Sequence, residues 1–275
     1  MERAERQPRV HIKRSTWEER APASAAGREV LSSALGQAED GLKRSDVTEA
    51  ARKDLVLIVP LAAMWGTGTR VRSMAKHVGE ALENPDAVRR ALERMVEGIE
   101  QGPEAAFEAL WHPDNYRRAA IKGFGTSFGT KLLSFLDEAV ADRGEADPCL
   151  IYDLMVCRTL AATGARWPAG ISGNGPTTFD PPTGCVRFAN YAAWCRLATE
   201  VSRAAGCTPA DVEYTFFRVG RQIGTSVELP RSGCGGTTAA EAPQGDDEAE
   251  AAALPDFDEP LATSVQELTD LLNRR

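Results

Sequence analysis

Apolar residues recur at helical spacing through the middle of the chain. Val88, Leu92, Met95 and Ile99 lie three or four positions apart, directly after the pair Asn84-Pro85. An asparagine N-cap followed by a first-turn proline is typical of a helix start, and this spacing places the apolar side chains on one helical face. The pattern therefore predicts an amphipathic helix that begins at residue 85.

Other segments carry the same kind of signal. Residues 186–205 repeat apolar positions at four-residue steps, and Thr208-Pro209 is a strong start signal for the last helix of the body. Asp114 is expected to cap a helix that runs through Ile121, and Asp147-Pro148 is expected to open another. The strand-like run at 55–63 contains Pro60 and has no plausible partner strand, so a buried helix or an extended segment fits it equally well. We predict an all-α fold.

The same periodicity divides the chain. Residues 1–45 are polar without a sustained period, and we interpret them as a mobile N-terminal arm with one short helix near Ala25–Leu42. Residues 46–221 are the predicted helical body. Residues 222–260 are rich in glycine, proline and acid, which predicts a linker. Residues 261–275 predict a short amphipathic helix, for which docking on its own domain or solvation is favoured over a partner.

Composition narrows the class of protein. The 275 residues contain no run of about 18 apolar residues and no apolar core behind the charged start. We therefore expect neither a membrane span nor a secretory signal, and we expect a cytoplasmic protein. The six cysteines form no CxxC pair and the three histidines are widely spaced, so no metal site and no cofactor are expected.

The net charge of −8 belongs to one end of the chain. Residues 241–275 hold ten acidic residues and two arginines, whereas the body mixes both signs evenly. A neutral body does not indicate a broad phosphate-binding face, but it permits a compact one.

The most unusual segment is the glycine-rich run at residues 117–139. A helix is expected to end at Lys122, and a second helix to open near Thr126–Phe128. The glycines allow a sharp turn between them, and the free amides of the second helix suit one phosphate. The predicted DNA-backbone contacts are therefore Gly123, Gly125, Thr126, Gly129 and Thr130.

Three phosphate-binding motifs compete for this run. A P-loop needs GxxxxGK[ST] after a strand, but here Thr130 separates Gly129 from Lys131 and a helix is expected before the turn. A dinucleotide fingerprint needs GxGxxG after a strand, and the spacing GxGxxxG does not fit it. The order of helix, Gly-x-Gly turn and helix fits a helix–hairpin–helix motif.

Lys131 and Asp153 are the candidate catalytic residues. Lys131 lies near the start of the second helix among apolar neighbours, and both features disfavour the charged ammonium form, so the amine can act as a nucleophile. Asp153 is one carboxylate within an apolar run, which is rarely placed without a partner. If their helices pack antiparallel, the two residues are offset by only ~7 Å along the axis. The alternatives are a phosphate-binding Lys131 and a structural pair of Asp153 with Lys131 or Arg158.

These residues resemble a known family. The lysine after a glycine hairpin, with an aspartate about twenty residues later, is similar to the helix–hairpin–helix DNA glycosylase superfamily. The similarity is greatest to prokaryotic proteins related to 8-oxoguanine DNA glycosylase. It covers roughly residues 55–220 and rests on MWGTGTR, GFGTSFGTKLLSF, LIYDLMVCRTL, FANYAAWCRLA and ADVEYTFF. The hairpin departs from the common LPGVGxxTA form.

The resemblance implies a DNA N-glycosylase. Such an enzyme turns a nucleotide out of the duplex, Lys131 attacks C1′ to form a Schiff base, and Asp153 stabilises the charged sugar. The implied partner is duplex DNA that carries an oxidised guanine or a modified phage base. Two other classes stay open, namely a non-catalytic helix–hairpin–helix DNA-binding module and a helical interaction domain without nucleic acid.

The base pocket is predicted from aromatic residues. Trp65 is the best candidate because Gly66 and Gly68 beside it indicate a close backbone approach. Phe128 and Phe217 are the other two residues assigned to the pocket, from a wider set of Phe124, Tyr152, Trp194 and Phe216. The cations that could meet phosphates are Arg70, Arg72, Arg117, Arg118 and Lys122.

Overall fold

The structure is a computed structural model. It describes residues 9–68, 72–112, 115–140, 144–163, 186–223 and 265–273. Within these ranges the fold is helical with one small two-stranded sheet, so the predicted all-α class is confirmed.

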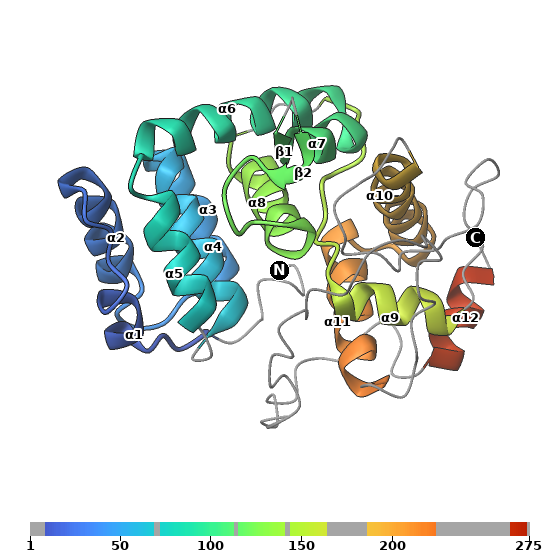
Figure 1. The fold of residues 1–275 in the computed structure, drawn as a ribbon. Coiled ribbons are helices and arrows are strands. Elements are labelled where there is room, and N and C mark those ends of the chain that lie inside the picture. Colours follow the sequence, from blue (N-terminus) through green and yellow to red (C-terminus); the bar gives the residue numbers. More distant parts are fainter. Residues whose placement is uncertain are drawn as a thin grey trace, which may run out of the picture.

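The first third of the chain forms a layer of helices beside the centre of the molecule (Figure 1). Its elements are α1 (Arg14–Glu18), α2 (Ala25–Gln37), α3 (Arg44–Lys53), the short 3₁₀ helix η2 (Leu55–Leu57), α4 (Ile58–Thr67) and α5 (Arg72–Ala81). The strand-like run at 55–63 is thus helical, with Pro60 in the first turn of α4, where a missing N–H is tolerated.

The next elements carry the chain over one side and then into the centre. They are α6 (Pro85–Gln101), α7 (Pro103–Ala109), β1 (Trp111–His112), β2 (Asn115–Ala119) and α8 (Thr126–Ala139). The predicted helix start at residue 85 is confirmed, because the Asn84 side chain accepts a hydrogen bond from the Ala87 amide and Val88, Leu92, Met95 and Ile99 are buried.

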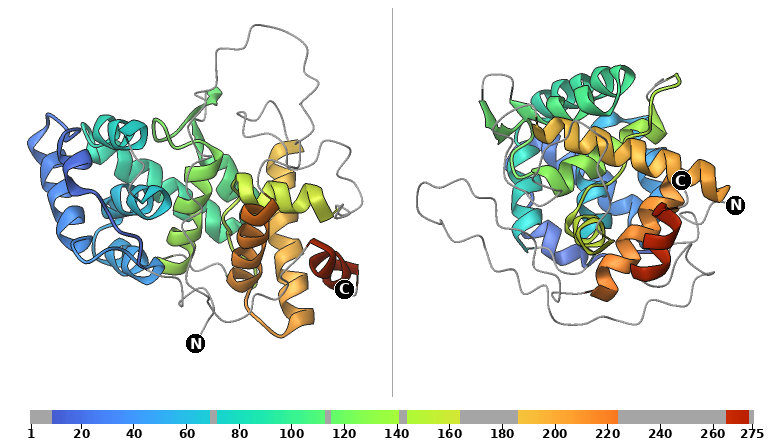
Figure 2. Two further views of the ribbon diagram at one scale, coloured as in Figure 1. Left: turned by 90° about the horizontal axis from the view of Figure 1, so that it is seen from below. Right: turned by 90° about the vertical axis from the view of Figure 1, so that its right-hand side faces the viewer.

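The remaining elements lie on the opposite side of α8 (Figure 2). They are α9 (Leu154–Thr163), α10 (Val186–Ala205), α11 (Pro209–Ile223) and α12 (Val265–Asn273). Thr208 and Asp211 cap α11 reciprocally, as the Thr208-Pro209 signal predicts. Helix α12 lies against α9 and buries Leu268 completely, so this predicted terminal helix docks on its own domain. The predicted linker at 222–260 lies almost entirely outside the described residues.

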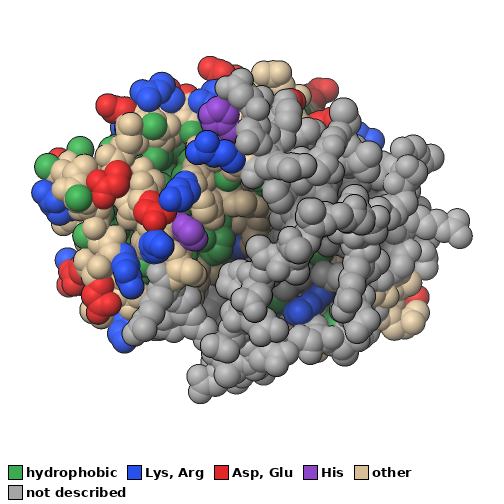
Figure 3. Space-filling model, in the orientation of Figure 1, with side chains coloured by type: hydrophobic (Ala, Val, Ile, Leu, Met, Phe, Trp, Pro, Cys, Tyr) green, Lys and Arg blue, Asp and Glu red, His purple; other side chains and the backbone are tan. Residues whose placement is uncertain are grey.

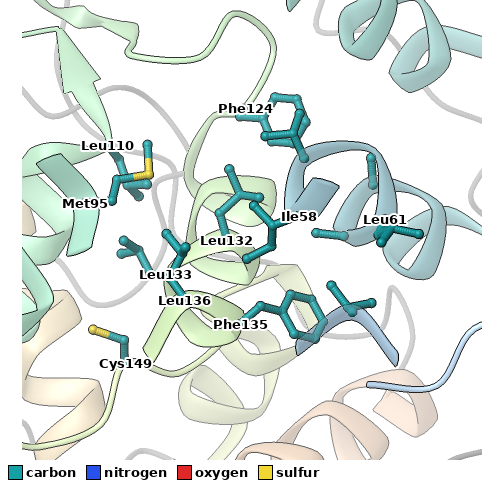
Figure 4. Close-up of a cluster of buried hydrophobic side chains, with 14 of the residues drawn as sticks. Ile58, Leu61, Met95, Leu110, Phe124, Leu132, Leu133, Phe135, Leu136 and Cys149 are labelled. Carbon is teal, nitrogen blue, oxygen red and sulfur yellow. The ribbon is translucent and has the colours of Figure 1, made fainter. Parts of the chain in front are cut away.

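Helix α8 is the centre of the hydrophobic core. Figure 4 shows Leu132 and Phe124 directed toward Ile58 and Leu61 of α4, while Leu133 and Leu136 face Met95, Leu110 and Cys149. Its side chains from Gly129 to Asp137 are all buried, so α8 is covered on every side and holds its residues rigidly.

The predicted mobile arm at 1–45 is wrong for the residues that the structure describes. Trp17 of α1 is 1% exposed, and Leu31 and Leu35 of α2 are buried in the same core as α4. The amides of Ala23 and Ser24 donate to Glu83, which ties the segment to the end of α5. The apolar residues of this region are too sparse to show a period, yet they dock it on the core through one tryptophan, three leucines and two alanines, namely Trp17, Leu31, Ala34, Leu35, Ala38 and Leu42.

Two predicted helix starts are also wrong. The segment expected to be helical after Asp114 is the strand β2, which pairs antiparallel with β1. An isolated helix of about eight residues is marginal, and cross-strand pairing replaces it. A strand therefore precedes the glycine turn, where the predicted helix–hairpin–helix motif has a helix. The segment after Asp147-Pro148 is extended up to Asp153, and α9 begins only at Leu154.

The part of the chain that the structure describes has no helix that is both long and apolar enough to cross a membrane.

Candidate active site

Lys131 lies on the second turn of α8, and its side chain is only 8% exposed. Leu132, Phe135 and the other apolar residues of α8 bury the helix around it. The amine group lies 5.2 Å from the centroid of the Phe128 ring, which belongs to the preceding turn. The lysine is therefore held in an apolar environment rather than displayed on the surface.

Asp153 is the last residue of an extended segment, immediately before α9. Its Oδ1 accepts hydrogen bonds from the amides of Met155 at 3.0 Å and Val156 at 3.2 Å. These are bonds of an N-cap residue, which satisfies amides that have no partner within the helix. The capping bonds fix the orientation of the carboxylate and leave Oδ2 to face Lys131.

The two candidate residues meet across α8 and α9. Lys131 Nζ lies 3.5 Å from Asp153 Oδ2, and the Asp153 side chain is 10% exposed. The same nitrogen donates to the backbone carbonyl and the hydroxyl of Ser127, both at 3.4 Å. All three contacts are long, so the amine is oriented by weak bonds that a reacting carbon can displace.

The closeness of Lys131 and Asp153 agrees with the prediction, although the predicted arrangement of their two helices does not. Asp153 does not lie inside a helix packed antiparallel to α8, as the sequence argument assumed, but at the N-cap of α9. The alternative partner Arg158 donates to the sulfur of Met155 at 3.9 Å. The ion pair of Asp153 is with Lys131.

The C-terminal end of α4 lies against the lysine side chain. A Cβ on Gly66 would lie 3.0 Å from Phe128 Cε1 and 3.1 Å and 3.2 Å from Cδ and Cε of Lys131. Trp65, the neighbour of Gly66, meets Phe135 edge to face with ring centroids 5.3 Å apart. The Trp-Gly pair therefore adjoins the lysine, and the glycine is required there because a side chain would press on the lysine stem.

The glycine turn before α8 contains both exposed and buried residues. Gly123 has a φ of 83° and packs so closely on His77 that a Cβ would lie 2.4 Å from the imidazole Cγ. Gly125 has open space where a Cβ would lie. These two residues remain candidates for contact with a DNA backbone.

Three of the predicted DNA-backbone contacts are wrong. Thr126 and Thr130 are buried, and Thr130 has no exposed surface. A Cβ on Gly129 would lie 2.9 Å from Leu110, so this glycine allows close packing inside the core. The sequence pattern marks the start of α8, but it does not show that α8 enters the core within its first turn.

Phe128 and Trp65, two of the predicted pocket residues, are partly buried. Phe128 adjoins the Lys131 amine, whereas the Trp65 ring contacts Phe135. Phe217, the third, is partly buried on α11, where the Arg221 guanidinium lies 6.0 Å from its ring centroid. Two other residues of α11 contact the backbone near Asp153, because Glu213 accepts from the Ile151 amide and Gly220 packs on the Met155 backbone. Phe124, Tyr152, Trp194 and Phe216 are core residues.

A buried ion cluster, which the sequence did not indicate, lies behind the site. Arg44 of α3 donates to Glu213 at 2.9 Å, to Glu138 at 2.8 Å and to Ser134 at 2.6 Å. Burial alone would lower the Arg44 pKa, but the two carboxylates outweigh it and raise the pKa. Burial raises the Glu213 pKa in spite of its bonds to Arg44 and to the Ile151 amide. The cluster links the first helices to α8 and α11.

Exposed basic residues lie beside the glycine turn. Lys122 pairs with Glu80 of α5 at 2.9 Å. Lys76 of α5 and Arg118 of β2 are also exposed. Figure 3 shows basic and histidine side chains gathered over this part of the surface. Hydrogen bonding from Lys122 lowers the pKa of Glu80. Arg70 and the side chains of Arg72 and Arg117 lie outside what the structure describes.

The buried thiols offer no competing nucleophile. Burial raises the pKa of Cys157 and of Cys195, and the nearby Asp153 adds to the shift at Cys157. A thiol with a raised pKa is a poor source of thiolate. Among the described residues no group of His, Cys, Asp and Glu is arranged to hold a metal ion.

Comparison with known families gives one match. The model of the family described as "Putative 8-oxoguanine DNA glycosylase OGG-like protein" matches residues 3–217 of this chain. No curated protein and no solved structure matches. The match includes Lys131 and Asp153. It also includes the first helices, which lie before residues 55–220, the region that the sequence resemblance covers.

Proposed function

Since the chain belongs to the OGG-like 8-oxoguanine DNA glycosylase family, we propose that it is a DNA N-glycosylase whose catalytic residues are Lys131 and Asp153. The observation that carries this proposal is the ion pair of 3.5 Å between two side chains that are 8% and 10% exposed. Burying a lysine and an aspartate costs free energy, which a catalytic role explains.

Base release requires that the reacting carbon reach Lys131. The C1′ atom of a nucleotide is shielded within a stacked duplex, so the target nucleotide is turned out into the protein. Phe128 beside the amine, together with Trp65 and Phe217, are the proposed aromatic faces for the extruded base. Gly123 and Gly125 are the proposed contacts of the adjacent DNA backbone.

The proposed reaction is a displacement at C1′. The Lys131 nitrogen forms a bond to C1′ while the N-glycosidic bond breaks and its electron pair leaves with the base. The Asp153 carboxylate first stabilises the positive charge that develops on the sugar. It then takes the proton from the ammonium group formed by the attack and passes it to the ring oxygen of the sugar. Opening of the sugar ring then gives a Schiff base, from which β-elimination of the 3′ phosphate cleaves the strand.

The proposed substrate class is duplex DNA with an oxidised or otherwise modified base. The family description supports an oxidised guanine. A modified base of invading phage DNA is the other member of the class, which would make the protein a defence enzyme. The two are distinguished by which base is released, because the chemistry at C1′ is the same for both.

A panel of modified duplexes tests the proposal. The protein is incubated with duplexes that contain oxidised guanine, glucosylated cytosine and ordinary bases, and released bases are identified by mass spectrometry. The wild type is expected to release one modified base, Lys131→Gln none, and Lys53→Gln, which changes an exposed lysine on α3, as much as the wild type. DNA binding without release of any base would instead indicate a non-catalytic DNA-binding module.

A further inference from the structure

The extended segment that ends at Asp153 is held by side chains instead of by another strand. The Cys149 amide donates to Asp137 at 2.9 Å, and the Ile151 amide donates to Glu213 at 2.7 Å. The Leu150 carbonyl accepts from the Tyr191 hydroxyl at 2.9 Å, and the Ile151 carbonyl accepts from the Trp194 indole at 3.1 Å. Four side chains from α8, α10 and α11 thus fix residues 149–151.

Thr130 holds the residue directly before Asp153. The Tyr152 amide donates to Thr130 Oγ1 at 2.9 Å, a normal length for such a bond. The hydroxyl proton of Thr130 is directed to the carbonyls of Ser127, at 3.4 Å, and of Tyr152, at 3.5 Å. Thr130 has no exposed surface, so no water competes for these bonds.

The two residues joined by this bond are the chain neighbours of the two residues in the ion pair. Thr130 directly precedes Lys131 on α8, and Tyr152 directly precedes Asp153. One hydrogen bond therefore connects the neighbours of both residues of the ion pair. Because α8 is buried on all sides, it provides a fixed reference from which the position of Asp153 is set.

We infer that Thr130 is a positioning residue that sets the separation of Lys131 and Asp153 through the Tyr152 backbone. The inference rests on the proposed function, because the separation matters only if the two side chains act on one sugar. The hydroxyl is needed, since a side chain of the same shape without it leaves the buried Tyr152 amide unsatisfied and the segment free to shift.

The ion cluster extends this positioning to the first helices. Glu213 uses Oε2 for the Ile151 amide and Oε1 for Arg44 of α3. A displacement of α3 therefore changes the support of Ile151, two residues before Asp153. Thr130 acts at a shorter distance and through a single bond, so it is the position at which the inference is tested.

The test compares Thr130→Val with two matched variants. Thr130→Ser keeps the hydroxyl, and Thr215→Val removes an equally buried hydroxyl that donates only to the Asp211 carbonyl of its own helix in the bonds given by the structure. Single-turnover base release, DNA affinity and hydrogen exchange of the peptide containing residues 149–153 are measured for each, below the unfolding temperature of the least stable variant.

The expected result is slower base release with nearly unchanged DNA affinity. Thr130→Val should slow base release by about 10- to 100-fold with DNA affinity changed by less than about twofold, because a small misplacement of reacting groups has effects of that size. Thr130→Ser should restore the rate, and Thr215→Val should keep it. Hydrogen exchange of residues 149–153 should rise in Thr130→Val alone.

Two results distinguish failure of this inference from failure of the proposed function. Normal base release by a folded Thr130→Val overturns the positioning role and leaves the glycosylase intact. If the wild type releases no base from any duplex, the proposed function fails. In that case hydrogen exchange still tests whether Thr130 fixes residues 149–153. Equal exchange in the wild type and in Thr130→Val would overturn this structural role as well. If Thr130→Val cannot be purified, Tyr191→Phe removes the neighbouring bond to Leu150, and the same separation of rate from binding is expected.

Discussion

The two carboxylate oxygens of Asp153 have different partners, and this division explains how a buried acid can be both structural and reactive. Oδ1 caps α9 through the amides of Met155 and Val156, whereas Oδ2 faces Lys131. An asparagine caps a helix about as well as an aspartate, but it carries no charge to stabilise a cationic sugar.

Asp153→Asn is therefore expected to separate the two roles. Both Asp153→Asn and Asp153→Ala leave the buried Lys131 without its ion pair, but only the asparagine keeps the cap, so Asp153→Asn should be about 1 kcal/mol more stable than Asp153→Ala. Base release should fall by at least ~100-fold in both variants, since the removal of one transition-state charge partner has effects of this size. Denaturant unfolding and single-turnover assays give both quantities, and an active Asp153→Asn would contradict the assigned role.

Gly66 allows a second separation at the scale of one residue. Alanine is the better helix former by about 1 kcal/mol, so Gly66→Ala should not unfold α4. Its methyl group would lie 3.1 Å and 3.2 Å from the Lys131 stem and should displace the amine. We expect base release to slow by about tenfold or more with unchanged thermal stability. Gly36→Ala is the matched control. A Cβ added at Gly36 lies in open space, so this variant should behave as the wild type.

For single residues, the sequence predicts which side chains carry the chemistry better than it predicts which residues are in contact. The sequence indicates Lys131 and Asp153 because a lysine after a glycine turn and an acid in an apolar run are unusual. It also predicts DNA contacts for Thr130 and Thr126, which are buried, because a sequence shows where a helix starts but not which neighbours cover it. The Arg44 cluster could not be predicted, since 169 positions separate Arg44 from Glu213.

At the scale of elements, local signals succeeded where a cap and an apolar face occur together, as in α6 and α11. They failed where tertiary contacts decide the conformation. Strand β2 forms because it can pair with β1, and residues 149–153 are extended because side chains from three helices hold their backbone. Neither cause is visible in the segment itself.

The linkage between the first helices and the site is tested at Arg44. Arg44→Met leaves the buried Glu213 without its cation, and we expect a loss of roughly 3–5 kcal/mol in the free energy of unfolding. Arg52→Met, an exposed arginine on the same helix that donates to the Glu138 and Ala139 carbonyls, should cost about 1 kcal/mol or less. Equal losses in the two variants would contradict the assigned role of the cluster.

The pH dependence of the Arg44→Met defect has a defined sign. Burial raises the Glu213 pKa above its ordinary value of 4.5, so the folded state binds this proton more tightly than the unfolded state does. Arg44 opposes this shift, so its loss in Arg44→Met raises the Glu213 pKa further, and the stability that the protonated form contributes to this variant is lost as the pH rises through the folded-state pKa. The defect should be smaller at acidic pH than at pH 7 when each variant is compared with the wild type at the same pH.

The whole molecule is acidic, and yet the proposed partner is a polyanion. The charge of −8 is concentrated in residues 241–275, so the body can present a local basic surface. Lys122 and Arg118 lie beside the glycine turn that precedes α8 and Lys131. The sequence predicted a helical domain from residue 46, but the family match from residue 3 and the buried Trp17 show that the first helices belong to it.

Lys122 tests whether this surface meets DNA. Lys122→Ala should weaken binding uniformly across sequences and reduce the slope of log affinity against log salt by about 1, because one phosphate contact is lost. Lys53→Ala, an exposed lysine on α3, should leave the slope unchanged. Salt titrations of duplex binding provide the measurement, and identical slopes for Lys122→Ala and the wild type would place the DNA elsewhere.

The central claim is that the amine of Lys131 attacks C1′, and reduction of the covalent intermediate tests it most directly. The protein is incubated with its modified duplex in the presence of sodium borohydride, and the cross-linked peptide is identified by mass spectrometry. We predict that the sugar is attached to Lys131 and that Lys131→Gln forms no adduct. An adduct on a different residue, or undiminished cross-linking by Lys131→Gln, would contradict the account.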